Sequence, residues 1–144
     1  MLRSRIIPCL LIHKKGLVKT INFKNPKYVG DPINAVKIFN EKEVDELIVL
    51  DIDATKENKA PNLKIIKSLA DECRMPFCYG GGITSVEEAV NIISLGVEKI
   101  ALSHSALTNI KLCEEIGDVI GKQSVVVVID VKKKKFLRGY DIYT

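Results

Sequence analysis

Two segments near opposite ends of the chain repeat one pattern, and this repeat constrains the fold more than any other feature. Arg5–Thr20 and Ser124–Gly139 each contain an apolar run, a lysine-rich turn and a short apolar segment that ends in a base. When the two segments are aligned, Leu11 falls opposite Asp130. The repeat indicates a duplicated structural unit. Its two copies differ at the end of the apolar run, where catalytic side chains are often found.

Apolar runs typical of buried parallel strands alternate with helix-start signals along the chain. The predicted strands are Ile6–Ile12, Leu47–Asp53, Phe77–Gly80, Lys99–Ser103 and Val125–Val131. This alternation predicts an α/β architecture made of βα units. The chain has 144 residues, whereas a closed eight-stranded barrel needs roughly 250. The units therefore form either a small open sheet or part of a barrel.

The repeat favours the barrel, because a duplicated half barrel would place the fifth strand as the counterpart of the first. We therefore predict a (βα)8 TIM-barrel fold truncated to about its first half plus strand five. Residues 1–144 would form a single partial barrel domain whose C-terminal units are missing.

Local sequence signals predict where the helices begin. Four helix starts are marked, by Asp31-Pro32, by Pro61, by a capping box in Thr84–Glu87, and by Thr108 or Asn109. Gly96 is expected to end the third helix. The expected apolar faces are Ala35, Ile38 and Phe39 in the first helix and Ile65, Ile66 and Leu69 in the second.

Composition excludes several classes of protein. The chain is 47% hydrophobic and 28% charged, which is typical of a globular protein. The longest apolar runs are far shorter than a membrane-spanning helix, and the run after Arg5 is too short for a signal peptide. The four cysteines lack a C-x-x-C spacing and predict reduced, mostly buried thiols in a cytoplasmic protein. We expect no metal site and no cofactor.

Lys132–Lys135 is the one dense basic cluster, and it leaves two interpretations open. It resembles a nucleic-acid patch when taken alone, but no aromatic residues are interleaved with the lysines. Its counterpart in the first repeat, His13-Lys14-Lys15, favours a solvated turn between two strand segments. We expect no nucleic-acid partner and no membrane partner.

A run of three glycines, Gly80–Gly82, lies between a predicted strand and a predicted capped helix. Glycines at this position allow backbone N–H groups to approach an anion, and the helix N-terminus adds a favourable dipole. The run therefore predicts a phosphate cradle. The alternative is a tight turn that needs glycine only for its backbone angles.

Polar side chains at the ends of other predicted strands are further candidates. Asp51 is a candidate site residue and Asp53 a weaker one, although either carboxylate could instead cap a loop. Asp130 follows five aliphatic residues, where burial would suit it to general acid–base catalysis. Ser103 and His104 could donate to a phosphate, or His104 could be an ordinary loop residue.

These motifs, taken together and in order, resemble the cyclase subunit of imidazole glycerol phosphate synthase. The similarity extends from Met1 to about Lys132, and its segments are RIIPCL, LVKT, FKNPKYVGDP, DELIVLDIDA, PFCYGGGI, GVEKI and VVVVIDVK. The resemblance implies a (βα)8 barrel with two-fold internal symmetry. It also implies that ammonia passes through the barrel from a glutaminase partner to a phosphoribosyl substrate of histidine biosynthesis.

The resemblance also implies roles for individual residues. Asp130 matches the catalytic aspartate of strand five. Substrate and phosphate-binding positions are matched by Lys19, Asp51, Gly81, Gly82, Ser103 and His104, although the last two stand where the family usually has Asn-Thr. Arg5, Glu46 and Lys99 match three of four charged residues at the ammonia entrance.

Leu11 departs from the family pattern, because the family has its other catalytic aspartate at this position. Leucine cannot transfer a proton, and such groups contribute about 10²–10⁴-fold. The departure resembles a side branch associated with surface-glycan genes, in which ammonia would amidate an N-acetylated sugar nucleotide. We therefore expect a phosphorylated sugar or nucleotide-sugar substrate. The alternatives are a histidine-pathway cyclase and an inactive half barrel, since this length of chain is expected to be inactive alone.

Overall fold

The computed structural model describes residues 3–134 and 138–143, and its centre is a seven-stranded sheet in the order β3-β2-β1-β4-β5-β6-β7. The parallel strands are β1 (Cys9–His13), β4 (Leu47–Asp51), β5 (Phe77–Gly80), β6 (Lys99–Leu102) and β7 (Val125–Val127). The prediction of parallel strands separated by helices is therefore confirmed. The arrangement is consistent with part of a (βα)8 barrel.

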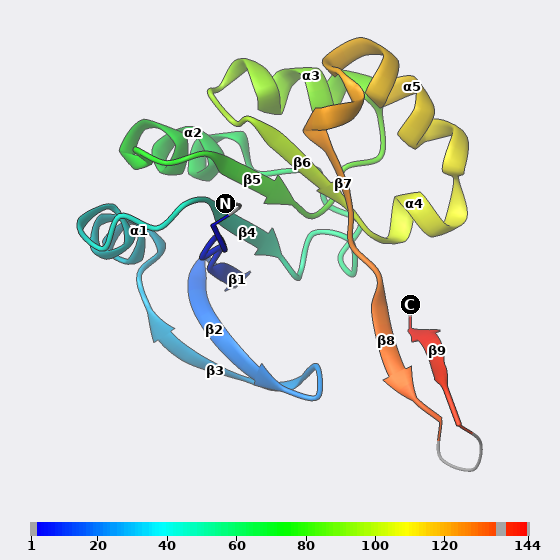
Figure 1. Ribbon diagram of the computed structural model, residues 1–144, viewed down its shortest axis with the longest axis horizontal. Helices are drawn as coiled ribbons and strands as arrows, with labels where there is room; N and C mark the ends of the chain where they lie inside the picture. Colours follow the sequence, from blue (N-terminus) through cyan, green and yellow to red (C-terminus); the bar gives the residue numbers. More distant parts are fainter. Residues whose placement is uncertain (1–2, 135–137, 144) are drawn as a thin grey trace.

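Two antiparallel hairpins extend from the parallel strands. β2 (Gly16–Ile21) pairs with β1 and with β3 (Lys24–Gly30). β8 (Asp130–Lys133) pairs only with β9 (Tyr140–Tyr143) and forms a separate two-stranded sheet. Both hairpins project away from the helices (Figure 1). The expected turn at His13-Lys14-Lys15 is present, but the sequence analysis did not predict β3.

The predicted fifth strand, Val125–Val131, is divided in the structure. β7 ends at Val127, and the Val128 N–H donates to the Leu102 carbonyl as the last link to β6. β6 ends there because the chain turns into a helix at Ser103, so residues 129–134 have no strand partner in the main sheet as far as the chain is described. Of these, Asp130–Lys133 pair with β9 instead. Lys135 of the predicted lysine turn lies outside the described residues.

The helices are α1 (Pro32–Glu41), α2 (Leu63–Glu72), α3 (Val86–Ser94), α4 (His104–Thr108) and α5 (Ile110–Ile120), with a 3₁₀ turn, η1, at Lys122–Ser124. Asp31 caps α1 through the Asn34 N–H, with Pro32 at the first turn, as expected. The cap of α2 is Asn62, so Pro61 does not begin that helix.

The remaining helix ends depart slightly from the predictions. The capping box of α3 is formed by Ser85 and Glu88, one residue later than predicted, and Leu95 followed by Gly96 ends the helix. Asn109 precedes α5 without a side-chain hydrogen bond. The short helix α4 was not predicted. It separates β6 from the fourth predicted helix start.

The hydrophobic core lies between the sheet and the helices that cover one of its faces (Figure 1). Ile66 and Leu69 of α2 are fully buried there, as predicted. In α1 the predicted Ala35 and Phe39 pack against the core, but Ile38 is 54% exposed and was wrongly included. The face is centred on the fully buried Val36, and Ile38, two residues on, lies on the opposite side of the helix.

The other face of the sheet carries a second apolar surface. Leu11, Ile48, Leu50 and Val126 are only half-buried and lie outside the core that faces the helices. Strand pairing places Leu11 beside Leu50 of β4 and Val18 of β2. In a barrel this is the inner face.

Candidate functional site

The amino-terminal ends of the parallel strands hold an ion cluster centred on Glu46. This residue precedes β4 and is the one charged side chain fully buried in the described part of the chain. Lys99 at the start of β6 donates to both carboxylate oxygens, at 2.7 and 2.8 Å. Arg5 reaches the same carboxylate at 3.4 Å from a more exposed position. The structure thus brings together all three residues assigned to the ammonia entrance by resemblance.

The carboxyl ends of the strands hold most of the other candidates. Asp51 ends β4, and its Oδ1 accepts hydrogen bonds from the N–H groups of Asp53 and Ala54, at 2.9 and 3.1 Å. This contact shapes the loop after β4 and corresponds to the capping alternative. The other carboxylate oxygen remains available, and Asp51 lines a cavity of about 470 Å³ together with Lys14, Lys15 and Lys59.

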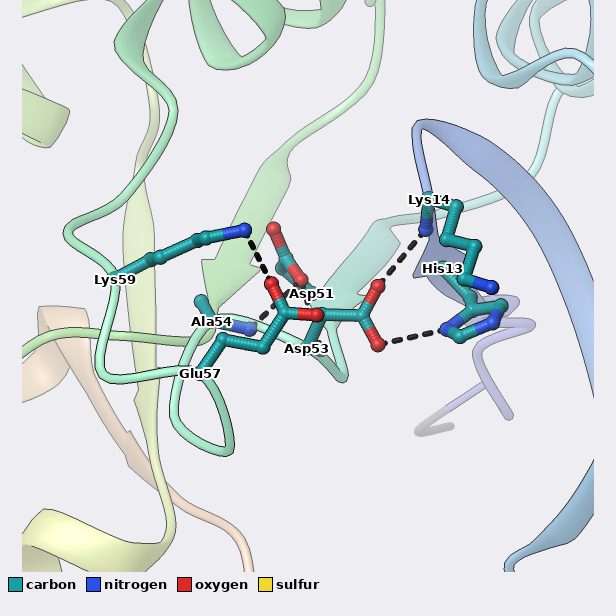
Figure 2. A network of polar contacts seen from close by, with 7 residues as sticks. All are labelled: His13, Lys14, Asp51, Asp53, Ala54, Glu57 and Lys59. Carbon is teal, nitrogen blue, oxygen red and sulfur yellow. Dashed lines mark hydrogen bonds and ion pairs between the residues drawn. The ribbon is translucent and has the colours of Figure 1, made fainter.

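Asp53 bridges two neighbouring strands. Its Oδ1 lies 2.7 Å from Nδ1 of His13, and its Oδ2 accepts the Lys14 N–H at 2.8 Å (Figure 2). Partial burial raises the pKa of Asp53, but the hydrogen bonds from the Lys14 backbone N–H and from His13, together with electrostatic attraction from His13 and Lys56, outweigh this and hold the pKa below its usual range. Sequence reasoning did not select His13 as a site residue. A signal was available in the sequence. His13 directly follows the first predicted strand and Asp53 ends the second, so both were expected at the same edge of the sheet.

Gly81 and Gly82 are held tightly against the loop after β4. Both have left-handed backbone angles, with φ of 122° and 73°. A Cβ on Gly81 would lie 2.4 Å from the Asp51 carbonyl oxygen, and one on Gly82 would lie 2.6 Å from the Lys59 carbonyl oxygen. The Gly82 N–H donates to Oγ1 of Thr55 at 3.3 Å. These contacts fit the tight-turn alternative and leave phosphate binding a prediction.

A second cavity of about 620 Å³ lies beside the glycines, between the loop after β4 and helices α3, α4 and α5. Gly82, His104 and Lys59 line it. Ser103 occupies the position before α4 but makes no capping bond, and Ser105 donates to the Ile83 carbonyl at 2.6 Å. The structure therefore brings Gly82 and His104 to one cavity. Ser103 is not part of its lining.

Lys19 and Asp130 lie in the two hairpins, away from this group. Lys19 is exposed on β2 and pairs in register with Lys27 of β3. Asp130 begins β8 opposite Tyr143, so its expected position at the end of a parallel strand is wrong. Neither residue lines the two cavities. The shared cause is that β2 and β8 are antiparallel hairpin strands, so neither residue lies at the carboxyl end of a parallel strand.

The cysteines depart from the expectation of mostly buried thiols. Cys78 is fully buried, Cys73 and Cys113 are half-buried, and Cys9 is exposed. Burial, with a smaller contribution from the nearby Glu46, raises the pKa of the Cys78 thiol to about 12. Cys9 is exposed because it lies on the uncovered face of β1.

Two further properties concern only residues 3–134 and 138–143. No cluster of three or more His, Cys, Asp or Glu side chains is placed there to hold a metal ion. No helix in the same residues is long and apolar enough to cross a bilayer.

Comparison with known sequences identifies the family. The family model described as "Histidine biosynthesis protein" matches residues 5–143. The chain belongs to this family. Over its whole length it is 55% identical to a protein of Vibrio vulnificus provisionally named as imidazole glycerol phosphate synthase subunit hisF3. It is 56% identical to one of Pseudomonas aeruginosa provisionally named as subunit hisF2.

A more distant relative is the imidazole glycerol phosphate synthase subunit HisF of Clostridium botulinum, 37% identical over 143 residues. This family member spans 55%, 57% and 56% of the lengths of the three relatives, respectively, and 99–100% of its own length is aligned. The aligned region is thus about half of each relative.

Proposed function

We propose that this family member acts in an ammonia-dependent synthase, in which a glutaminase partner supplies ammonia at the amino ends of the strands. The observation that carries the proposal is the Arg5–Glu46–Lys99 cluster, because a buried charged cluster is costly to maintain without a role. It lies at the opposite end of the sheet from the cavities and from Asp51, Gly82 and His104.

The surface between the two ends suits neutral ammonia. The uncovered face carries Leu11, Ile48, Leu50 and Ala101, which are apolar. Moving ammonium over such a surface is unfavourable because a charged group would lose its hydration, whereas neutral ammonia loses much less. Under this proposal the cluster admits ammonia at one end, and the cavity residues hold an anionic substrate at the other.

We infer that the substrate is a phosphorylated sugar or nucleotide sugar, and that the product is an amidated sugar for a surface polysaccharide. Leu11 supports this, since an aliphatic side chain in the sheet cannot provide the proton transfer that cyclisation would need there. A histidine-pathway cyclase is the second candidate. The family and the names of the relatives favour it.

The test supplies ammonium chloride at alkaline pH, so that no partner is needed, and follows both reactions by mass spectrometry. Ammonia-dependent incorporation of nitrogen into the sugar substrate would support the first candidate. Formation of imidazole glycerol phosphate would overturn it in favour of the second. No product from either substrate would support an inactive half barrel.

A second assay, with the glutaminase partner, tests whether the cluster is needed to deliver ammonia. With the partner and glutamine present, Arg5→Met should reduce glutamine-dependent turnover while leaving turnover with ammonium chloride close to that of the unsubstituted chain, since the Arg5 side chain is 62% exposed. Equal loss with both nitrogen sources would contradict a role in delivery. Lys67→Gln, on the outer surface of α2, is the matched control.

A further inference from the structure

His13 and Asp53 meet at the carboxyl end of two adjacent parallel strands. His13 is the last residue of β1, and Asp53 lies two residues beyond the end of β4. The register that pairs Ile12 with Asp51 brings them together, although they are 40 positions apart in the chain. His13 also lies on the same side of β1 as Leu11, because side chains alternate along a strand. Its ring therefore belongs to the uncovered, inner face.

The contact fixes both partners. Asp53 uses one carboxylate oxygen for Nδ1 of His13 and the other for the Lys14 N–H, so the carboxylate cannot rotate freely. An ionised carboxylate only accepts hydrogen bonds, so Nδ1 carries the hydrogen and Nε2 of neutral His13 keeps its lone pair. Burial raises the pKa of Asp53, but the hydrogen bonds from Lys14 and His13 lower it by more, so the carboxylate stays ionised.

The second ring nitrogen is available for chemistry. In Figure 2 it lies on the side of the imidazole away from Asp53. Nε2 has no hydrogen-bond partner within residues 3–134 and 138–143, and the side chain is 24% exposed. The adjacent cavity of about 470 Å³ is lined by three lysines and by the carboxylates of Asp51, Asp53 and Glu57, and His13 is not part of its lining. Lys14 and Lys15 directly follow His13 in the chain and are exposed, so they are the cations that would attract an anionic substrate to the end of β1.

We propose that His13 is a general base and that Asp53 is the residue that positions it. This inference rests on the proposed function, in which ammonia attacks an electrophilic carbon of an anionic substrate. The new C–N bond leaves an extra proton on nitrogen. Nε2 of His13 takes that proton, and the resulting imidazolium, balanced by Asp53, returns it to the departing oxygen. Ammonia and substrate thus become the amidated sugar and an alcohol or acid that carries the departing oxygen, with no proton gained or lost.

A purely structural ion pair makes a different prediction. His13, Asp53 and the Lys14 backbone also tie the β1–β2 turn to the loop after β4, and removing such a tie would lower stability. It would give the same tautomer of His13, because the hydrogen bond to ionised Asp53 fixes Nδ1–H in either role, but it would leave kcat unchanged in a folded His13 variant. Measurements of tautomer and reactivity therefore test whether His13 is oriented as a base, and kcat in folded variants separates the two roles.

The first experiment measures the tautomer and reactivity of His13 in the ¹⁵N-labelled chain. Long-range ¹H–¹⁵N spectra should show Nδ1 protonated and Nε2 unprotonated. Diethyl pyrocarbonate should acylate His13, and the other histidine of the chain, His104, provides an internal reference in the same peptide map. In Asp53→Asn the amide NH₂ should reverse the tautomer, so the rate of His13 modification should fall several-fold relative to His104. An Nε2-protonated His13, or no change in this ratio, would overturn the proposal.

The second experiment uses whichever ammonia-dependent reaction the chain catalyses. His13→Gln and Asp53→Asn should lower kcat by about 10²–10⁴-fold with little change in KM, and Asp53→Glu should restore part of the loss. Circular dichroism and urea unfolding establish that each variant is folded. Unchanged kcat in folded His13→Gln would overturn the assignment. If the unsubstituted chain makes no product but the tautomer and reactivity are as expected, the proposed function fails while the oriented base is supported.

Discussion

Replacing Lys99 with methionine should destabilise the chain far more than the same replacement of Arg5. Glu46 has a side chain only 5% exposed, and Lys99 contacts both of its oxygens. Without Lys99 the carboxylate would remain buried with only Arg5 at 3.4 Å. Breaking a buried pair in this way typically costs about 3–5 kcal/mol. We expect about 3 kcal/mol for Lys99→Met, because Arg5 and some water remain near the carboxylate.

Arg5→Met provides the matched comparison. The Arg5 side chain is 62% exposed, so its pairing with Glu46 is screened by solvent and should contribute less than about 1 kcal/mol. A double variant, Glu46→Leu with Lys99→Met, removes both charges and leaves an apolar pair. Its stability should lie within about 1 kcal/mol of the starting chain, because no uncompensated charge is buried.

Urea unfolding followed by circular dichroism measures all three variants at neutral pH. The reasoning requires the order Lys99→Met as least stable, then Arg5→Met and the double variant close to the unsubstituted chain. Equal losses for Lys99→Met and Arg5→Met would refute it. A double variant as unstable as Lys99→Met would also refute it, since the loss would then come from packing rather than from the buried charge.

Three further predictions concern other parts of the fold. Gly82→Ala should lower the free energy of unfolding, measured with urea, by more than about 2 kcal/mol. Gly117→Ala inside α5 should leave that free energy unchanged or raise it by up to about 1 kcal/mol. Equal effects of the two substitutions would contradict the close approach of backbone atoms at Gly82. Because the pKa of Asp53 is lowered by folding, its contribution to stability is present above its unfolded pKa of about 3.9 and is lost as pH falls through the lower folded pKa. The stability difference between the unsubstituted chain and Asp53→Asn should therefore shrink below about pH 4, and a constant difference down to acid unfolding would contradict this. The thiol of Cys78, with a pKa of about 12, should resist iodoacetamide in the native chain. Cys9 should react faster because it is exposed, although burial raises the pKa of its thiol too, and native labelling of Cys78 as fast as that of Cys9 would contradict the burial of Cys78.

Elements with local signals were largely predictable from the sequence. Asp31-Pro32 begins α1 as expected, and the apolar run Phe77–Gly80 matches β5 at both ends. The capping box of α3 was misplaced by one residue because both Thr84 and Ser85 have an acidic residue three positions later. Such signals act over a few residues, so a single sequence contains most of the information that sets them.

Other parts depended on neighbours distant in the chain. Val125–Val131 has the composition of one continuous strand, yet only Val125–Val127 pairs with β6, because β6 itself ends at Leu102. Asp130 was therefore misplaced. His13 was overlooked because its partner, Asp53, is 40 residues away. The one available signal, their position at the ends of two predicted parallel strands, shows a shared edge of the sheet but not which side chains meet there.

The sequence by itself determined the βα alternation, the main helix caps, the glycine turn and, through the family match, which residues to examine. Only the tertiary structure decided which of those residues meet. Glu46 and Lys99 are 53 positions apart, and strand pairing brings them into one buried ion pair. The same pairing sets His13 against Asp53, whereas Asp130 pairs in β8 opposite Tyr143. Caps and turns form from adjacent residues, whereas a site forms where strand register and burial place distant side chains within a hydrogen bond of each other.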